Sequence, residues 1–183
     1  MTGTAIRALL LVPVTGVGLA MAADRDLPTN SEPFVSVHVP CCQEPPEVVI
    51  RTLNALAASN WNRYEVICLD NNTADPSLWL PVREHCERLG PRFRFFHVDR
   101  LEGAKAGALN LCLQLTDPRA MYVAVVDADY CVTPGFLRHA MSHLNGSSLA
   151  QVQFPQAYRN GGYPGEGLTG EYAHYFDVFL PLA

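Results

Sequence analysis

The sequence has few charged residues and no excess of basic ones. Lys and Arg number 13 against 18 Asp and Glu among 183 residues, which gives a net charge of −5, and no long basic run is present. This balance argues against a protein that binds nucleic acid by neutralising phosphates. Charged residues make up 17% of the chain and hydrophobic ones 49%. Such a composition excludes a disordered chain and fits either a sheet buried on both faces or a domain resting against a membrane.

Cysteines are also few, and they lack the paired CxxC spacing of a structural zinc site. The six cysteines are too sparse for a disulfide scaffold, so a reducing compartment fits best. The adjacent Cys41 and Cys42 are interpreted as structural rather than as redox-active or metal-binding. A chain of this length has room for one domain with a single core.

No stretch has the length of a complete membrane span. Residues 8–23 form an uncharged run of sixteen residues, just short of the ~17–25 residues of a span, and contain a proline and two glycines. This run fits a signal peptide or part of a membrane helix better than a disordered leader. We assign residues 1–33 to an apolar leader or membrane-span remnant plus a linker, and residues 34–183 to the globular domain.

The globular part alternates short runs rich in Val, Ile, Phe and Tyr with longer amphipathic segments. This alternation is typical of repeated βαβ units around a parallel sheet. Strands are expected at Phe34–Val39, Tyr64–Leu69, Phe93–Val98, Met121–Val126 and Leu149–Phe154. Helices are expected at Glu47–Ser59, Leu78–Leu89, Ala104–Leu115 and Pro134–Leu144. The sequence therefore predicts an α/β fold with a mainly parallel sheet.

Two of the expected strands run directly into acidic residues. Asp70 follows the second strand, where it would project into a turn, and Asp127 and Asp129 follow the fourth. In a parallel sheet, ligands gather at the carboxyl ends of the strands. Side chains two positions apart in an extended segment point the same way, so Asp127 and Asp129 can present two carboxylates to one Mg²⁺ or Mn²⁺ ion. A solvated turn is the alternative, but the position after a buried strand favours the cation site.

Two further segments carry residues suited to a nucleotide ligand. In Gly103-Ala-Lys-Ala-Gly-Ala-Leu-Asn110, the amides of a helix start and Lys105 can hold a phosphate. Close helix packing by the two glycines, with a solvated lysine, is an equally weighted alternative, and the order of a Walker loop is absent. Glu44, in the segment after the first strand, is a candidate contact for a nucleotide or its ribose.

Together these segments resemble family 2 inverting glycosyltransferases, above all the cellulose-synthase-like, membrane-associated glucan synthases. The resemblance extends from about Phe34 to Arg159 and rests on the ordered set VSVHVPCCQEP, EVICLDNNT, GAKAGALN, VAVVDADY and QVQFPQAYRN. It implies a three-layer α/β/α fold of the GT-A type. It also implies a divalent cation and the transfer of a sugar, with inversion, from a UDP-sugar donor to a glycan acceptor.

The same resemblance implies roles for individual residues. Glu44 and Asp70 would contact the uridine, and Lys105 would help to hold the donor. Asp127 would lie near the diphosphate and ribose, and Asp129 would bind the metal. The residues that would line the sugar or acceptor pocket are Gln153, Pro155 and Gln156.

Two motifs of that family are not found in this sequence. One is a Thr-Glu-Asp-like segment that would supply the general base, and the other is a Gln-x-x-Arg-Trp motif that would help to hold donor and acceptor. The chain ends in an apolar run without a polar cap. We therefore expect a catalytic domain that is incomplete at its C-terminus, and we assign no base. His38 and His97 are expected to be structural imidazoles.

These features bear on three candidate functions. The first is the sugar transferase, and the second is a truncated or degenerate fragment that binds a nucleotide sugar without turnover. The third is a nucleotidyltransferase, which would want a glycine-rich, basic loop where this chain has CCQEPP. Because activated sugars are cytosolic, a membrane-span remnant is favoured over a signal peptide. We accordingly expect a membrane-associated protein with a cytoplasmic catalytic domain.

Overall fold

The computed structural model describes residues 9–12, 32–144 and 151–154. Its strands are β1 (Leu9–Val12), β2 (Val35–Cys41), β3 (Tyr64–Asn71), β4 (Phe93–Val98), β5 (Tyr122–Val126) and β6 (Gln151–Gln153). Its helices are α1 (Pro46–Ala57), α2 (Pro76–Leu89), α3 (Ala104–Leu115) and α4 (Phe136–Leu144).

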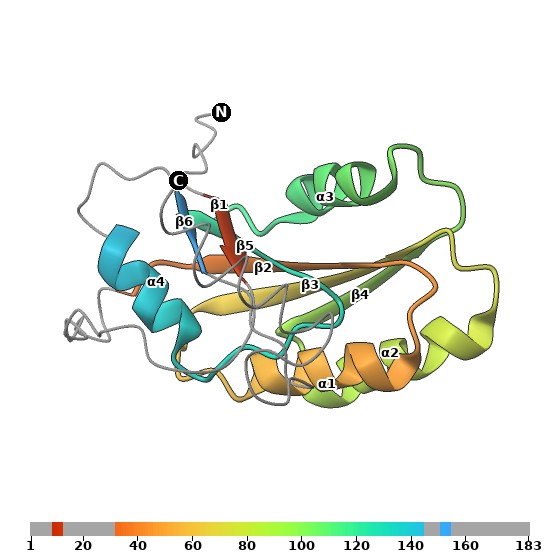
Figure 1. Cartoon of the computed structure of the whole chain (residues 1–183), viewed down its shortest axis with the longest axis horizontal. Helices are drawn as coiled ribbons and strands as arrows, with labels where there is room; N and C mark the ends of the chain where they lie inside the picture. Colours follow the sequence, from red (N-terminus) through yellow and green to blue (C-terminus); the bar gives the residue numbers. More distant parts are fainter. Residues whose placement is uncertain (1–8, 13–31, 145–150, 155–183) are drawn as a thin grey trace, which may run out of the picture.

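The strands form one sheet in the order β4-β3-β2-β5-β1-β6. Every neighbouring pair in it is parallel. Figure 1 shows α1 and α2 on one face of this sheet and α3 on the opposite face. Helix α4 packs on the same side as α1, because residues of both helices belong to one hydrophobic core. The expected α/β fold with a parallel sheet between helical layers is confirmed.

Strand β3 shows how both faces of the sheet are buried. Val66 and Cys68 belong to the larger core, which α1, α2 and α4 cover, whereas Ile67 and Leu69 pack with Ala108 of α3. Neighbouring residues of a strand point to opposite faces, so a strand covered on both sides must be apolar along its length. All eight residues of β3 are indeed buried. The low content of charged residues follows from this double burial.

Local signals in the sequence set most element boundaries. Helix α2 begins with Pro76 after Asp75, whose carboxylate accepts a hydrogen bond from the Ser77 N–H at 2.9 Å. It ends at Leu89 and is followed by Gly90, whose φ of 97° suits glycine. Expected boundaries that fall within the described residues lie within two residues of the observed ones, and those of α3 and β4 coincide with them.

Strand β1 was not expected. Its residues belong to the apolar stretch interpreted above as a leader or membrane-span remnant, yet Leu9 pairs with Val123 of β5 on one side and Gln151 of β6 on the other. A short apolar run has no periodicity that separates a buried strand from other apolar segments. The rest of that stretch lies outside the described residues. In the described ranges, no helix combines the length and apolar character needed to cross a bilayer.

Candidate functional site

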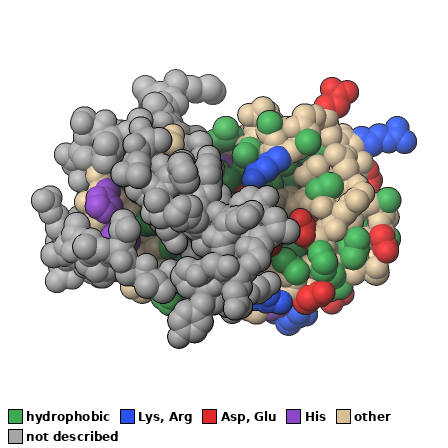
Figure 2. All heavy atoms as spheres, in the orientation of Figure 1, with side chains coloured by type: hydrophobic (Ala, Val, Ile, Leu, Met, Phe, Trp, Pro, Cys, Tyr) green, Lys and Arg blue, Asp and Glu red, His purple; other side chains and the backbone are tan. Residues whose placement is uncertain are grey.

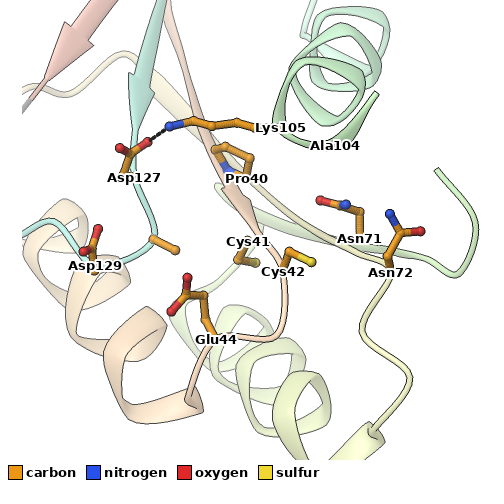
Figure 3. A pocket seen from close by; sticks show the side chains of 11 residues that line it. Pro40, Cys41, Cys42, Glu44, Asn71, Asn72, Ala104, Lys105, Asp127 and Asp129 are labelled. Atoms are coloured by element: carbon orange, nitrogen blue, oxygen red, sulfur yellow. Dashed lines mark hydrogen bonds and ion pairs between the residues drawn. The ribbon is translucent and has the colours of Figure 1, made fainter. Parts of the chain in front are cut away.

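A cleft lies where the strand order of the sheet reverses. From the central strand β2 the chain moves outward to β3 on one side and later places β5 on the other side, and ligands bind beyond the carboxyl ends of strands at such a point. The cleft has a volume of about 320 Å³, within the size range of small-molecule sites. Figure 3 shows its lining side chains, which come from the carboxyl ends of β2 and β3, from the segments after β2, β3 and β5, and from the start of α3. They are Pro40, Cys41, Cys42, Glu44, Asn71, Asn72, Ala104, Lys105, Asp127, Ala128 and Asp129.

The two carboxylates after β5 both line this cleft, as the sequence predicted, but for a different reason. The segment is a turn rather than an extended strand, because the Tyr130 N–H donates to the Asp127 carbonyl at 3.1 Å. The Thr52 hydroxyl holds the same turn by donating to the Ala128 carbonyl at 2.7 Å. Asp127 and Asp129 therefore do not point in one direction by strand alternation. In Figure 3 Asp127 faces the start of α3, and Asp129 lies on the side of Glu44.

Lys105 crosses the cleft and pairs with Asp127. Its ammonium group donates a hydrogen bond to Asp127 Oδ1, as the dashed line in Figure 3 marks. The side chains are 55% and 32% exposed, so the pair is open to solvent and to a ligand. Lys105 is the only lysine in the sequence. The cleft thus holds one exposed ammonium group, which is paired with a carboxylate.

The carboxyl groups of Glu44 and Asp129 lie near each other in the cleft. Partial burial raises the pKa of Glu44, and the nearby charge of Asp129 raises it further. Burial and the neighbouring negative charge both disfavour the ionised form of Glu44. A cation bound nearby would offset the repulsion from Asp129. Oxygen ligands of this type suit Mg²⁺ or Mn²⁺, which commonly keep several waters and bridge protein carboxylates to phosphates. Among the described residues, no three His, Cys, Asp or Glu side chains are placed to hold a metal ion by themselves.

The backbone before α3 explains the two glycines around Lys105. Gly103 has a φ of 84°, a left-handed conformation that favours glycine. A Cβ on Gly107 would lie 1.8 Å from the carbonyl oxygen of Glu102, so only glycine fits there. Both glycines therefore serve the local backbone at the start of α3. This backbone is compatible with the phosphate hypothesis, because Lys105 lines the cleft.

The far wall of the cleft is polar but uncharged, and sequence reasoning missed it. Asn71 ends β3 and Asn72 follows in a left-handed conformation, with a φ of 59°. The Asn72 side chain forms two hydrogen bonds with the backbone of Leu101. Cys42, exposed at the cleft, was interpreted as structural. The pair of asparagines directly after a strand rich in Val and Ile was the signal available for this wall.

Asp70 does not project into a turn as expected, because β3 continues through Asn71 and keeps Asp70 within the sheet. Its side chain is 5% exposed and does not line the cleft. One carboxylate oxygen lies 2.8 Å from His97 Nδ1, and the other accepts a hydrogen bond from the Thr73 hydroxyl at 2.8 Å. The register explains the first contact, since Asp70 and His97 are opposite each other on β3 and β4. A direct contact of Asp70 with a nucleotide remains a prediction.

The two histidines expected to be structural do have partners within the protein. His97 also contacts Asp99 at 2.9 Å and stacks on the ring of Trp79, with 4.3 Å between ring centroids. His38 Nε2 lies 2.9 Å from the Thr116 hydroxyl oxygen, and burial lowers the pKa of its imidazole to about 4. Neither histidine lines the cleft. We therefore assign both a role in stabilising the fold.

The expected sugar or acceptor segment is described only in part. Gln153 is exposed at the end of β6 and does not line the cleft. Pro155 and Gln156 lie outside the described residues. The cleft residues above therefore form the candidate site. On the face seen in Figure 2, described acidic and basic side chains lie among hydrophobic and uncharged ones.

Comparison with known proteins agrees with this arrangement. The sequence profile described as Glycosyl transferase family 2 matches residues 36–176, which is most of the chain. The chain belongs to glycosyl transferase family 2. The resemblance inferred from its ordered motifs is confirmed.

Two curated relatives illustrate the similarity. The chain is 34% identical over 137 residues to Glucomannan 4-beta-mannosyltransferase 1 of Oryza sativa subsp. japonica, covering 71% of this chain and 26% of that protein. It is 31% identical over 129 residues to the UDP-forming cellulose synthase catalytic subunit of Xanthomonas axonopodis pv. citri, covering 69% of this chain and 16% of that protein. The chain thus spans about a quarter or less of the length of these relatives.

Two solved structures share the fold. A mannosyltransferase from Pyrobaculum calidifontis, in complex with GDP-Man and Mn²⁺, superposes with a TM-score of 0.57 at 22% identity, over 66% of this chain and 35% of that one. S. aureus TarS in complex with UDP-GlcNAc superposes with a TM-score of 0.50 at 20% identity, over 60% and 30%. The fold is therefore of the GT-A type, as expected from the resemblance.

Proposed function

We propose that this chain carries the donor-binding half of a glycosyltransferase that moves a sugar from a nucleotide-diphosphate donor to a glycan acceptor. The observation that carries the proposal is the cleft at the strand reversal, where Lys105 faces Asp127 and the carboxylates of Asp129 and Glu44 lie beside them. One side chain suits a diphosphate and the others suit a divalent cation or a ribose. Membership of family 2 supports the same chemistry.

The charges of the cleft suggest how the donor is held. The ammonium group of Lys105 leaves Asp127 and binds a diphosphate oxygen, which frees the Asp127 carboxylate for the ribose or the cation. Backbone amides at the start of α3, where Ala104 and Lys105 line the cleft, would add a favourable site for the same anion. Glu44 accepts a hydrogen bond from a ribose hydroxyl. For Lys105 this step exchanges a contact within the protein for one with the donor.

We propose Asp127 and Asp129 as the protein ligands of Mg²⁺ or Mn²⁺. Two carboxylates are sufficient, because these ions commonly complete their coordination with water and phosphate oxygens. The proximity of Glu44 to Asp129 supports the assignment, since the Asp129 charge adds to burial in raising the pKa of Glu44. Bound there, the cation would stabilise the negative charge that develops on the departing diphosphate. The P. calidifontis mannosyltransferase structure with GDP-Man and Mn²⁺ is a precedent within this fold.

The finer parts of the proposal concern the substrates and the location of the protein. We propose UDP as the nucleotide carrier, inversion at the transferred carbon and a glycan as acceptor. Asp70, paired with His97 behind the cleft wall, would bind the uracil after a side-chain rearrangement. Gln153, Pro155 and Gln156 would contribute to the sugar or acceptor pocket. Membrane association with a cytoplasmic catalytic domain belongs to the same proposal.

Titration calorimetry tests the proposal directly. UDP and GDP are titrated into the chain with and without Mn²⁺, and release of sugar from the corresponding nucleotide sugars is followed in parallel. We expect UDP to bind in a manner that depends on Mn²⁺ and on Asp129. Tighter binding of GDP than of UDP would correct the carrier, and binding of neither nucleotide would end the proposal.

A second candidate function is nucleotide-sugar binding without turnover. It is favoured by the cleft itself, whose lining supplies groups suited to a donor and none that is assigned as a general base. The two functions differ in one measurement. Saturable donor binding without sugar release, with or without an added glycan acceptor, would support the binding fragment over the transferase.

A further inference from the structure

Asn72 forms a two-bond bridge to the segment that precedes α3. Its side-chain Nδ2 donates to the Leu101 carbonyl oxygen at 2.9 Å, and the Leu101 N–H donates to Asn72 Oδ1 at 2.8 Å. The amide thus pairs with Leu101 as a neighbouring strand residue would. One of its two N–H groups and its carbonyl oxygen are used within the protein, so the side chain ties the end of β3 to the Leu101 backbone.

The bridge lies four residues before Lys105, in a segment whose backbone is unusual. Gly103 and Ala104 both have positive φ values, 84° and 47°. A left-handed conformation is uncommon for alanine and persists only where the surroundings impose it. The Leu101 side chain packs against the small core under α3, which supplies a second anchor. Together the two anchors fix the path on which the chain enters α3.

The direction in which the Lys105 side chain points depends on this path of the backbone. Its side chain is half exposed, and Asp127 across the cleft is the partner that the structure gives it. A long, exposed side chain gains little from one surface ion pair, because ordering it costs conformational entropy. The backbone from which it projects must therefore be ordered in advance for the ammonium group to meet the carboxylate or a diphosphate.

We propose that Asn72 is a positioning residue that holds Lys105 in the donor site through its bridge to Leu101. This inference rests on the proposed function, in which Lys105 binds the donor diphosphate. It also explains why asparagine follows β3 here. Asparagine tolerates a φ of 59° and offers a donor and an acceptor together, whereas glycine would supply only the conformation.

The single lysine of the chain makes the proposal measurable without any ligand. An amine-acetylating ester labels Lys105, and peptide mass spectrometry separates this product from the acetylated N-terminus. An amine held against a carboxylate reacts more slowly than a free one, so the rate reports how firmly Lys105 is positioned. Asp127→Asn sets the rate for a lysine released from its partner.

Asn72→Gly keeps the left-handed backbone and removes the bridge. We expect this variant to raise the acetylation rate of Lys105 about threefold or more, to near the rate of Asp127→Asn. Gln43→Gly is the matched control, because Gln43 also has a positive φ, 56°, at the same edge of the sheet, and its replacement leaves the bridge in place. Its rate should equal that of the wild type. Circular dichroism and thermal unfolding verify that each variant is folded.

Two outcomes would overturn the proposal. One is a wild-type rate in folded Asn72→Gly while Asp127→Asn reacts faster, and the other is an equal rise in Gln43→Gly. If Asn72→Gly does not fold, Asn72→Asp decides, since it keeps the acceptor for the Leu101 N–H but repels the Leu101 carbonyl. Asn72→Asp must then react faster than the wild type.

A second arm separates this inference from the proposed function. UDP with Mn²⁺ should protect Lys105 from acetylation in the wild type, and protection by neither UDP nor GDP would count against the donor site. The ratio of rates without ligand would still decide the role of Asn72. If the nucleotide does bind, the combination of Asn72→Gly with Lys105→Gln should bind it no more weakly than Lys105→Gln alone, because both changes act through the same ammonium group.

Discussion

The ammonium group of Lys105 is hydrogen-bonded to Asp127 Oδ1, so a proposed phosphate ligand and a proposed cation ligand neutralise each other across the cleft. For Lys105→Gln we therefore expect opposite effects on two ligands. Mn²⁺ alone should bind about threefold or more tighter, because Asp127 is released, and UDP with Mn²⁺ should bind about tenfold more weakly. Calorimetry measures both. Arg83→Gln removes one positive charge from the surface of α2 and should change neither affinity. Equal changes in one direction would contradict the exchange of partners.

Asp129→Asn tests the cation assignment. The residue is exposed in the turn after β5, so the substitution should shift the melting temperature by no more than about 2 °C. It should remove the dependence of UDP binding on Mn²⁺, because one of two protein ligands is lost. Glu87→Gln, which neutralises a 70% exposed acid on α2, is the control for the change in net charge. An unaltered Mn²⁺ affinity in Asp129→Asn would falsify the assignment.

Asp70→Asn tests the nucleoside contact. The substitution leaves the buried contacts of the carboxylate with His97 and Thr73 poorly matched, so we expect a loss of stability of about 1–3 kcal/mol. It should also weaken the binding of uridine measured without metal. Asp99→Asn changes the other carboxylate on the same imidazole, 83% exposed, and should leave uridine binding intact. Equal uridine affinity in folded Asp70→Asn would remove the proposed role.

Burial of His38 should make stability depend on pH. The pKa of its imidazole is lowered from 6.5 to about 4, so the unfolded chain binds a proton in a pH range where the folded protein does not. The stability from this group is complete above about pH 6.5 and falls as the pH drops towards about 4, by a total on the order of 3 kcal/mol. Urea unfolding of the wild type and of His38→Gln across this range measures the difference. Parallel curves for the two proteins would contradict the prediction.

Gly107→Ala should disturb the start of α3. Its Cβ would lie 1.8 Å from the Glu102 carbonyl oxygen, so the segment before Lys105 must move. We expect a loss of stability of about 1–3 kcal/mol and weaker UDP binding. Gly90→Ala is the matched control, because a Cβ there meets no atom within 4 Å and only the φ of 97° is strained, by about 1 kcal/mol. UDP titrations should detect a defect in Gly107→Ala alone.

Periodicity was sufficient to predict most of the fold. The expected bounds of α3 and β4 coincide with the observed ones, because each follows from apolar spacing within a single element. Strand β1 could not be predicted in this way, since its place depends on pairing Leu9 with Val123, far away in the sequence. Nothing in the composition of a short apolar run specifies such a distant partner.

The sequence predicted the charged residues of the site, but not the contacts that hold them in place. Asp127, Asp129, Glu44 and Lys105 meet at one cleft because the carboxyl ends of parallel strands do so. Asp70 was wrongly expected to project into a turn, because its burial depends on how far β3 continues beside β4. Side-chain bridges such as the one from Asn72 to Leu101 require the relative placement of two loops.

Cys42 gives the molecule a natural attachment point for a fluorescent reporter. The other five cysteines are buried, whereas Cys42 is exposed at the wall of the cleft. Partial burial, followed by the charge of Asp70, raises the pKa of its thiol, so maleimide coupling is best carried out at mildly alkaline pH. A dye on that sulfur would sense occupancy of the cleft, and ligand screening could begin with the native sequence.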